Sequence, residues 1–148
     1  MSEVRDLAEL HVRSFNERAW SRVSEIYAPD LVMTEPAGTT EGIEPFLRTA
    51  NGFVTAFPDS RMQVTAIIES GNNVVIEGLY SGTHTGPLAG PQGEVPPTGR
   101  KLTLPLCDVC EMAAGRIVSI RAYYDQMSFA TQIGLIPDPA AVKPEAHN

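Results

Sequence analysis

The chain has 148 residues, of which 43% are hydrophobic and 20% are charged. This length predicts one domain, and the composition is too apolar for a disordered protein. The formal net charge of −7 argues against binding to nucleic acid or to anionic membranes, because both need a basic face. Neither a membrane-spanning stretch nor a signal peptide is recognisable, so we expect a cytoplasmic protein.

The first part of the sequence predicts helices. Apolar residues recur at three- and four-residue steps over residues 4–15, which places them on one helix face. A short second helix is expected over residues 21–29, a short strand over 31–34 and a third helix over 42–57. His11 lies on the apolar face of the first helix, where we interpret it as a core residue.

From residue 62 onward the hydrophobic period changes to two, which is typical of strands. Strands are predicted over residues 62–68, 74–83, 101–112 and 116–125. The last two are joined by a tight turn at 113–115, so they must pair antiparallel. Helices followed by such strands predict an α+β fold, in which helices cover one face of a curved, mostly antiparallel sheet and enclose a pocket.

Two segments are predicted to lack regular structure. Glycine and proline supply eight of the fifteen residues at 85–99, which indicates a surface loop. This loop is either the rim of a pocket or a solvated connector. We place the single domain over residues 1–136 and expect a proline-containing tail over 137–148.

Asp125 is the first candidate for chemistry, because it ends the last predicted strand. On a regular strand it shares one face with Arg121 and Tyr123. If that face lines the pocket, a desolvated carboxylate there can transfer protons. The alternative is that Asp125 caps a helix that begins at the next residue.

Asp108 is the second candidate, because a charge inside an apolar strand needs a partner. If paired residue numbers across the tight turn sum to 229, Asp108 lies opposite Arg121. If a bulge makes the sum 228, Cys107 lies opposite Arg121. The sequence leaves this register open, and both a structural ion pair and a functional pair are compatible with it.

Other residues could act in a pocket. His84, between a strand and the long loop, is either an acid/base group or a structurally bonded histidine. Candidates for the pocket lining, with core packing as the alternative for the aromatic ones, are Phe15, Glu35, Asn51, Phe53 and Tyr123. The C-x-x-C spacing of Cys107 and Cys110 places their sulfurs on opposite faces of a strand. With no zinc-ligand spacing and no glycine-rich phosphate motif, we expect neither a metal nor an organic cofactor.

Several short motifs follow one another in a characteristic order over residues 1–136. They are Phe-Pro-Asp at 57–59, Ser-Gly-Thr-His-Thr-Gly at 81–86, Pro-Thr-Gly-Arg at 97–100, Gly-Arg-Ile-Val at 115–118, Tyr-Tyr-Asp-Gln at 123–126 and Gln-Ile-Gly-Leu at 132–135. Together they resemble the SnoaL-like polyketide cyclases of the nuclear-transport-factor-like α+β cone superfamily.

This resemblance implies a cofactor-free enzyme that closes a ring of a small hydrophobic polyketide by intramolecular aldol condensation. It assigns the acid/base role to Asp125 and implies a homodimer formed through the sheet. Some family cyclases carry a histidine on the penultimate strand, where this chain has Cys107, Asp108 and Cys110.

Two alternatives to the cyclase remain open. Asp108, Arg121 and Asp125 are reminiscent of the acid–arginine–acid set of limonene epoxide hydrolases, although the spacing differs, and a ketosteroid-isomerase-like proton shift is also possible. The other alternative is a dimeric module that binds a small molecule without catalysis.

Overall fold

The computed structural model describes residues 2–90 and 93–137. Its helices are α1 (Glu3–Asn16), the 3₁₀ turn η1 (Trp20–Arg22), α2 (Val23–Ile26), α3 (Ile43–Ala56) and α4 (Gln126–Gln132). Its strands are β1 (Tyr27–Glu35), β2 (Gly38–Glu41), β3 (Arg61–Ser70), β4 (Asn73–Thr83), β5 (Leu88–Gly90), β6 (Gly93–Val95), β7 (Lys101–Ala113) and β8 (Arg116–Tyr124). Apart from its first residue, the predicted tail lies outside the described residues.

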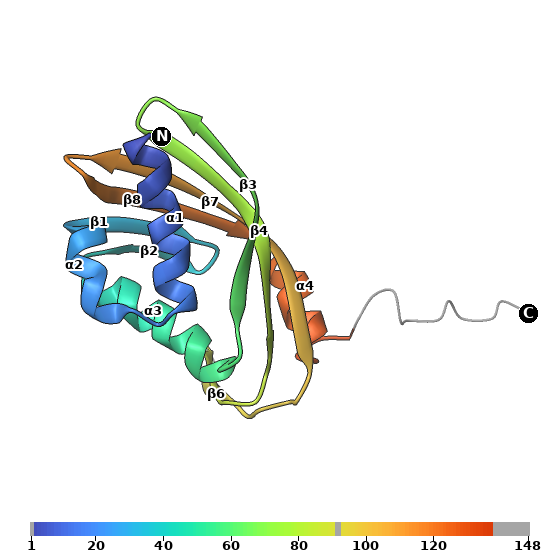
Figure 1. The fold of residues 1–148 in the computed structure, drawn as a ribbon. Helices are drawn as coiled ribbons and strands as arrows, with labels where there is room; N and C mark the ends of the chain where they lie inside the picture. The colour runs from blue at the N-terminus through green and yellow to red at the C-terminus, as the bar shows by residue number, and fades with distance from the viewer. Residues whose placement is uncertain (1, 91–92, 138–148) are drawn as a thin grey trace, which may run out of the picture.

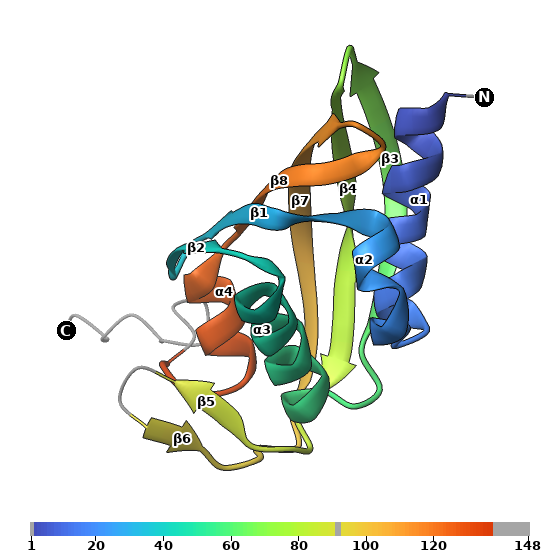
Figure 2. The same cartoon turned by 90° about the vertical axis from the view of Figure 1, so that its left-hand side faces the viewer.

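Six strands form one sheet in the order β2-β1-β8-β7-β4-β3, and β5 pairs with β6 in a separate hairpin. Every neighbouring pair is antiparallel except β1 and β8, which run parallel. The long strands bend, and α1 and α3 lie on the concave side of the sheet (Figures 1 and 2). The expected α+β fold with helices on one face of a curved, mostly antiparallel sheet is confirmed.

Helix α1 begins where its sequence predicts. The hydroxyl of Ser2 accepts a hydrogen bond from the backbone N–H of Arg5, which caps the first turn. Leu7, Ala8 and Val12 are buried at helical spacing, so this apolar face packs on β3 and β4. The helix thereby brings His11, on the same face, over the sheet.

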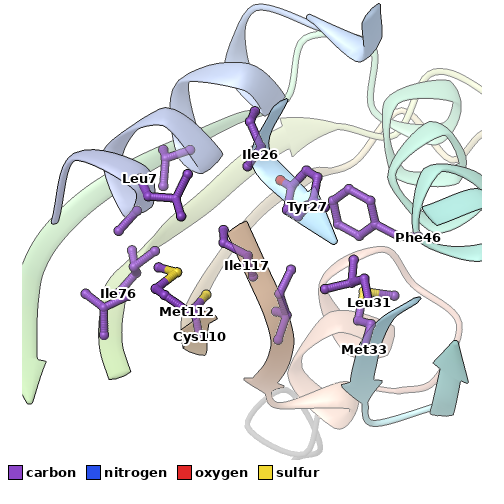
Figure 3. Packing of buried hydrophobic residues seen from close by; sticks show 14 of the residues in the cluster. Leu7, Ile26, Tyr27, Leu31, Met33, Phe46, Ile76, Cys110, Met112 and Ile117 are labelled. Atoms are coloured by element: carbon purple, nitrogen blue, oxygen red, sulfur yellow. The ribbon is translucent and has the colours of Figure 1, made fainter. Parts of the chain in front are cut away.

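The larger core cluster joins α1, α2 and α3 to the middle of the sheet. Ile26, Leu31, Ile76 and Ile117 are fully buried in it. Figure 3 shows Tyr27 and Phe46 side by side, and their ring centroids are 4.5 Å apart. A second cluster around Phe57, Tyr80 and Ile133 fills the other end of the fold. The helices are therefore joined to the sheet by two clusters of buried apolar side chains.

The register of β7 and β8 corrects both sequence-based alternatives. Ala113 pairs with Arg116 across a two-residue turn, as the sum of 229 requires, but a bulge then shifts the pairing by one residue. Asp108 consequently pairs with Ala122, and Arg121 pairs with Val109. Because successive strand residues face opposite sides, Asp108 and Arg121 lie on opposite faces of the sheet.

Two short strand pairs escape prediction. One is a hairpin after Glu35, in which β2 pairs with the end of β1. The segment expected as a loop at 85–99 contains the β5–β6 hairpin. Both are short and largely exposed, so they lack the apolar alternation that signals a strand. Within the described ranges, no helix is long and apolar enough to cross a membrane.

Candidate active site

A cavity of about 150 Å³ lies between the concave face of the sheet and helices α1 and α3. This confirms the predicted pocket between sheet and helices. Its walls are mainly apolar and aromatic, and they also carry one imidazole and two carboxyl groups, those of His11, Glu35 and Asp108. A mostly apolar cavity with a few polar groups is the usual form of a small-molecule site.

His11, Tyr27 and Asp108 form a hydrogen-bonded chain across three elements. Nδ1 of His11 on α1 lies 2.5 Å from the hydroxyl of Tyr27 on β1. Nε2 of His11 lies 3.3 Å from Oδ2 of Asp108 on β7. The His11 and Asp108 side chains are only 11% and 15% exposed. Both nitrogens of the imidazole are therefore engaged, and Asp108 is held in a fixed orientation.

The donors and acceptors of this chain follow from its chemistry. An ionised carboxylate can only accept, so Nε2 of His11 carries the hydrogen that points at Asp108. In the neutral imidazole Nδ1 is then the acceptor, and Tyr27 donates to it. Burial raises the pKa of Tyr27 well above its usual value, so this phenol keeps its proton. Oδ1 of Asp108 makes no hydrogen bond to any described residue and is available to a ligand.

A second carboxyl group lies at the end of β1. Glu35 lines the same cavity as Asp108. Burial raises the pKa of Glu35, and a hydrogen bond from Tyr124 partly offsets this shift. Burial also raises the pKa of Tyr124 to about 12, so its hydroxyl remains a donor. Glu35 therefore keeps its proton to a higher pH than an exposed glutamate does.

The aromatic end of the cavity contains two residues that the sequence analysis selected. Phe15 and Phe53 line it together with Trp20 and Tyr80. Tyr80 lies between the two phenylalanines, with ring centroids 6.1 Å and 5.7 Å away. The buried Tyr80 hydroxyl has no hydrogen-bond partner among the described residues. This end of the cavity suits a flat or cyclic apolar group.

Two predicted lining residues lie elsewhere. Asn51 is on the exposed side of α3 and does not line the cavity. Tyr123 is 53% exposed, and its partner Cys107 lies on the face of the sheet opposite to Asp108. Neither residue points toward the enclosed side of its element, and neither is among the lining residues of the cavity.

Asp125 occupies the capping position that the sequence left as its alternative role. Its carboxylate accepts hydrogen bonds from the backbone N–H groups of Met127 and Ser128 at the start of α4. The residue is exposed and does not line the cavity. Because Arg121 lies on the other face of the sheet, the set of Asp108, Arg121 and Asp125 does not come together.

His84 lies in the packed end of the fold and not in the cavity. It is fully buried, its ring packs on Phe57, and its Nδ1 lies 2.9 Å from the hydroxyl of Thr98. Burial lowers the pKa of His84. These contacts fit the structurally bonded histidine that the sequence allowed.

The segment around His84 is tied to the end of α3. Backbone N–H groups of Thr85 and Gly86 donate to the carbonyl of Ala56. The carboxylate of Asp59 accepts from the N–H and the hydroxyl of Thr83 at 2.7 Å and 2.8 Å, which lowers the pKa of Asp59. The Phe-Pro-Asp and Thr-His-Thr-Gly stretches thus bind each other and stabilise the fold.

The sequence analysis did not select His11, Tyr27 or Tyr124 as residues of the site. A signal for the first was present, because His11 follows the buried Leu7 by one helical turn. The contact between His11 and Asp108 also had a signal in the sequence. In β7 the even-numbered residues Leu102, Leu104, Cys110 and Met112 are buried. Asp108 is also even-numbered, so it points to the same enclosed face of the sheet.

A larger hollow of about 690 Å³ adjoins the cavity. Helix α3, the β5–β6 hairpin and α4 surround it, and we call it the outer vestibule. It shares four lining residues with the cavity, namely Glu35, Thr49, Phe53 and Tyr124. The carboxyl of Glu35 therefore lies where the two hollows meet. Across residues 2–90 and 93–137, no three histidine, cysteine or acidic side chains gather as metal ligands do.

The sequence and the fold of the chain are similar to those of known proteins. The model of the SnoaL-like polyketide cyclase family matches residues 5–133. AclR, described as "a putative hydroxylase" from Streptomyces galilaeus, has a TM-score of 0.80 at 22% identity, over 93% of this chain and 85% of its own. IdmH from Streptomyces antibioticus, described as "a putative polyketide cyclase", has a TM-score of 0.76 at 25% identity, over 90% of this chain and 99% of its own. TsrD from Streptomyces laurentii has a TM-score of 0.78 at 21% identity, over 90% and 96%. No curated protein matches the sequence.

Proposed function

Because the chain belongs to the SnoaL-like polyketide cyclase family, we propose that it is a cyclase-type enzyme that works by proton transfer without a cofactor. Its substrate is a small hydrophobic molecule of the polyketide type. The observation that carries the proposal is the contact of Asp108 with His11 inside an apolar cavity.

Asp108 is the general base of this proposal. Its Oδ1 takes a proton from the carbon between two carbonyl groups, and the C–H electron pair becomes an enolate. His11 and Tyr27 hold the carboxylate in place through Oδ2. The apolar walls hold the folded substrate and exclude water.

Glu35 is the general acid. In the aldol step the enolate carbon attacks a second carbonyl carbon of the same molecule and forms the carbon–carbon bond. The carbonyl oxygen becomes a hydroxyl by taking the proton of Glu35, whose raised pKa keeps that proton available. Exchange with solvent then returns one proton to Glu35 and removes one from Asp108.

This assignment differs from the one that the family resemblance implies. The resemblance gives the acid/base role to Asp125, whose carboxylate instead caps α4. The two assignments are distinguished by substitution. In D108N the carboxylate is lost from the cavity, and in D125N the cap is kept because asparagine also caps helices.

The test uses linear poly-β-ketone methyl esters, with ring closure followed by product analysis. We expect D108N to reduce turnover by about 10²- to 10⁴-fold, while D125N retains it. The reverse pattern supports Asp125. If the wild-type protein binds the esters but turns over neither these nor a panel of epoxides and enolisable ketones, the non-catalytic binding module is supported.

The open face of the sheet supports the proposed homodimer. Val32, Ile68 and Tyr123 share this face by register and are 38%, 54% and 53% exposed. A second copy of the chain would cover these apolar side chains. Sedimentation equilibrium tests this, and a Y123E substitution is expected to shift a dimer toward monomer. A monomeric wild-type protein contradicts it.

A further inference from the structure

The outer vestibule bears on what kind of molecule reaches the carboxyl groups. Glu35 and Tyr124 line both hollows, so a ligand that contacts Glu35 from the cavity has one end facing the vestibule. The cavity alone is small, at about 150 Å³, and the vestibule adds about 690 Å³. A ligand that fills both is longer than the cavity.

The two ends of this space differ in chemistry. The cavity is mainly apolar and aromatic, with Phe15, Trp20 and Tyr80 in its walls. The vestibule carries charge, because Arg48 on α3 and Glu94 on β6 line it in addition to Glu35. Arg48 is the one basic side chain among its described lining residues.

Arg48 has no assigned role within the fold. It is exposed, and it forms no ion pair or side-chain hydrogen bond with any described residue. Some arginines of the chain do make such contacts, since Arg22 pairs with Glu25 and Arg18 donates to the carbonyls of Phe15 and Ser60. Several others, Arg61 among them, make none to a described residue, and Arg48 differs from these in lining the vestibule. Arg48 therefore offers a planar set of donors at the open end of an apolar space, in a protein with a net charge of −7.

We propose that Arg48 makes the vestibule a carboxylate-binding site, so that the ligand has a cyclic apolar end in the cavity and a carboxylate at Arg48. The inference rests on the proposed function, which it deepens by naming the substrate class as acids, in preference to esters. A guanidinium group matches a carboxylate because two parallel N–H groups can donate to its two oxygens. Arg48 also offsets the repulsion that the acidic protein exerts on such a ligand.

Binding can be measured without turnover, because Trp20 is the only tryptophan of the chain and lines the cavity. The probes are ω-phenylalkanoic acids of increasing chain length and their methyl esters, titrated against tryptophan fluorescence excited where the phenyl ring does not absorb. Wild type is expected to prefer the acid over the ester by about three- to tenfold. The preference is expected to be largest at the chain length that joins the cavity to Arg48.

Two variants locate the preference. R48Q is expected to bind acid and ester equally. R61Q removes the same charge from another exposed arginine, at the start of β3 and away from the vestibule, and is expected to keep the wild-type preference. The inference is overturned if R48Q keeps the preference, if R61Q loses as much of it, or if neither probe binds.

Failure of this inference is distinguishable from failure of the proposed function. If R48Q abolishes the preference while no compound is turned over, the carboxylate site stands and the catalytic proposal fails. If turnover depends on Asp108 but the preference does not depend on Arg48, only the carboxylate site is refuted.

Discussion

Nε2 of His11 lies 3.3 Å from Oδ2 of Asp108, although the two residues are 97 positions apart in the sequence. The contact joins α1 to β7 inside the cavity. It also gives a largely enclosed carboxylate, whose side chain is 15% exposed, the hydrogen-bond donor that it requires. Because both His11 nitrogens are engaged, our proposal assigns substrate contact to Asp108 and a positioning role to His11.

Tyr27 completes this arrangement, and removal of its hydroxyl tests the positioning role. Y27F leaves Nδ1 of His11 without its donor, so the imidazole is free to change tautomer and Asp108 loses its fixed partner. We expect about a tenfold loss of kcat with little change in KM, and an altered pH profile. Y123F, on the open face of the sheet, is the control and is expected to leave both unchanged. An unaltered pH profile in Y27F contradicts the role.

Glu35 makes stability depend on pH in a definite direction. Its pKa is raised in the folded protein from the ordinary value of 4.5, so the folded chain binds the proton more tightly than the unfolded chain. Protonated Glu35 therefore makes the folded protein more stable at low pH. This contribution to the free energy of unfolding is lost as the pH rises from about 4.5 through the raised pKa of Glu35 in the folded protein. E35Q cannot ionise and lacks this loss.

Urea unfolding of wild type and E35Q over this pH range measures the effect. The stability of wild type relative to E35Q is expected to decrease as the pH rises. A constant difference contradicts the half-buried placement of this carboxyl. In the enzyme assay, kcat/KM of wild type is expected to fall over the same range if Glu35 is the acid.

Asp125 is expected to matter for stability more than for turnover. D125A removes the acceptor for the N–H groups of Met127 and Ser128 and should lower the free energy of unfolding by about 1 kcal/mol. D125N, which keeps an acceptor oxygen, should lower it by less. Thermal unfolding of the two variants gives the comparison, and a D125A variant as stable as the wild type would show that the cap has no energetic role.

Gly86 is expected to tolerate no side chain. A Cβ at this position would lie 1.9 Å from the carbonyl oxygen of Thr55, so G86A forces the segment away from the end of α3. Loss of its hydrogen bonds to Ala56 should cost about 1–3 kcal/mol of folding free energy. G52A is the matched control, because no atom lies within 4 Å of a Cβ there. Equal unfolding midpoints would contradict the close packing.

The sequence predicted the elements that bury an apolar face. Helix α3 was expected over residues 42–57 and spans Ile43–Ala56, and β3, β4, β7 and β8 lie where the period of two indicated. The predictions failed where hydrophobic pattern carries no information, as in the exposed strand β2 and in the β7–β8 register. A bulge of one residue displaced Arg121 from Asp108, and no pattern in the side chains marks it.

The sequence indicated some residues of the candidate site but not the contact between His11 and Asp108, because that contact depends on tertiary structure. Phe15, Glu35, Phe53 and Asp108 do line the cavity. His11 was interpreted as a core residue. Its position on an apolar helix face is compatible both with a packed residue and with a polar group that lines a cavity. Only its tertiary partners, Tyr27 and Asp108, distinguish them.

The central claim, that Asp108 removes a proton inside the cavity, is tested most directly by deuterium exchange. A β-keto ester too short to cyclise is incubated in heavy water, and NMR follows the loss of the hydrogen between its carbonyls. Wild type is expected to accelerate this exchange above the buffer rate, with D125N alike and D108N about 10²-fold slower or more. Exchange that is undiminished in D108N, or lost in D125N instead, would contradict the account.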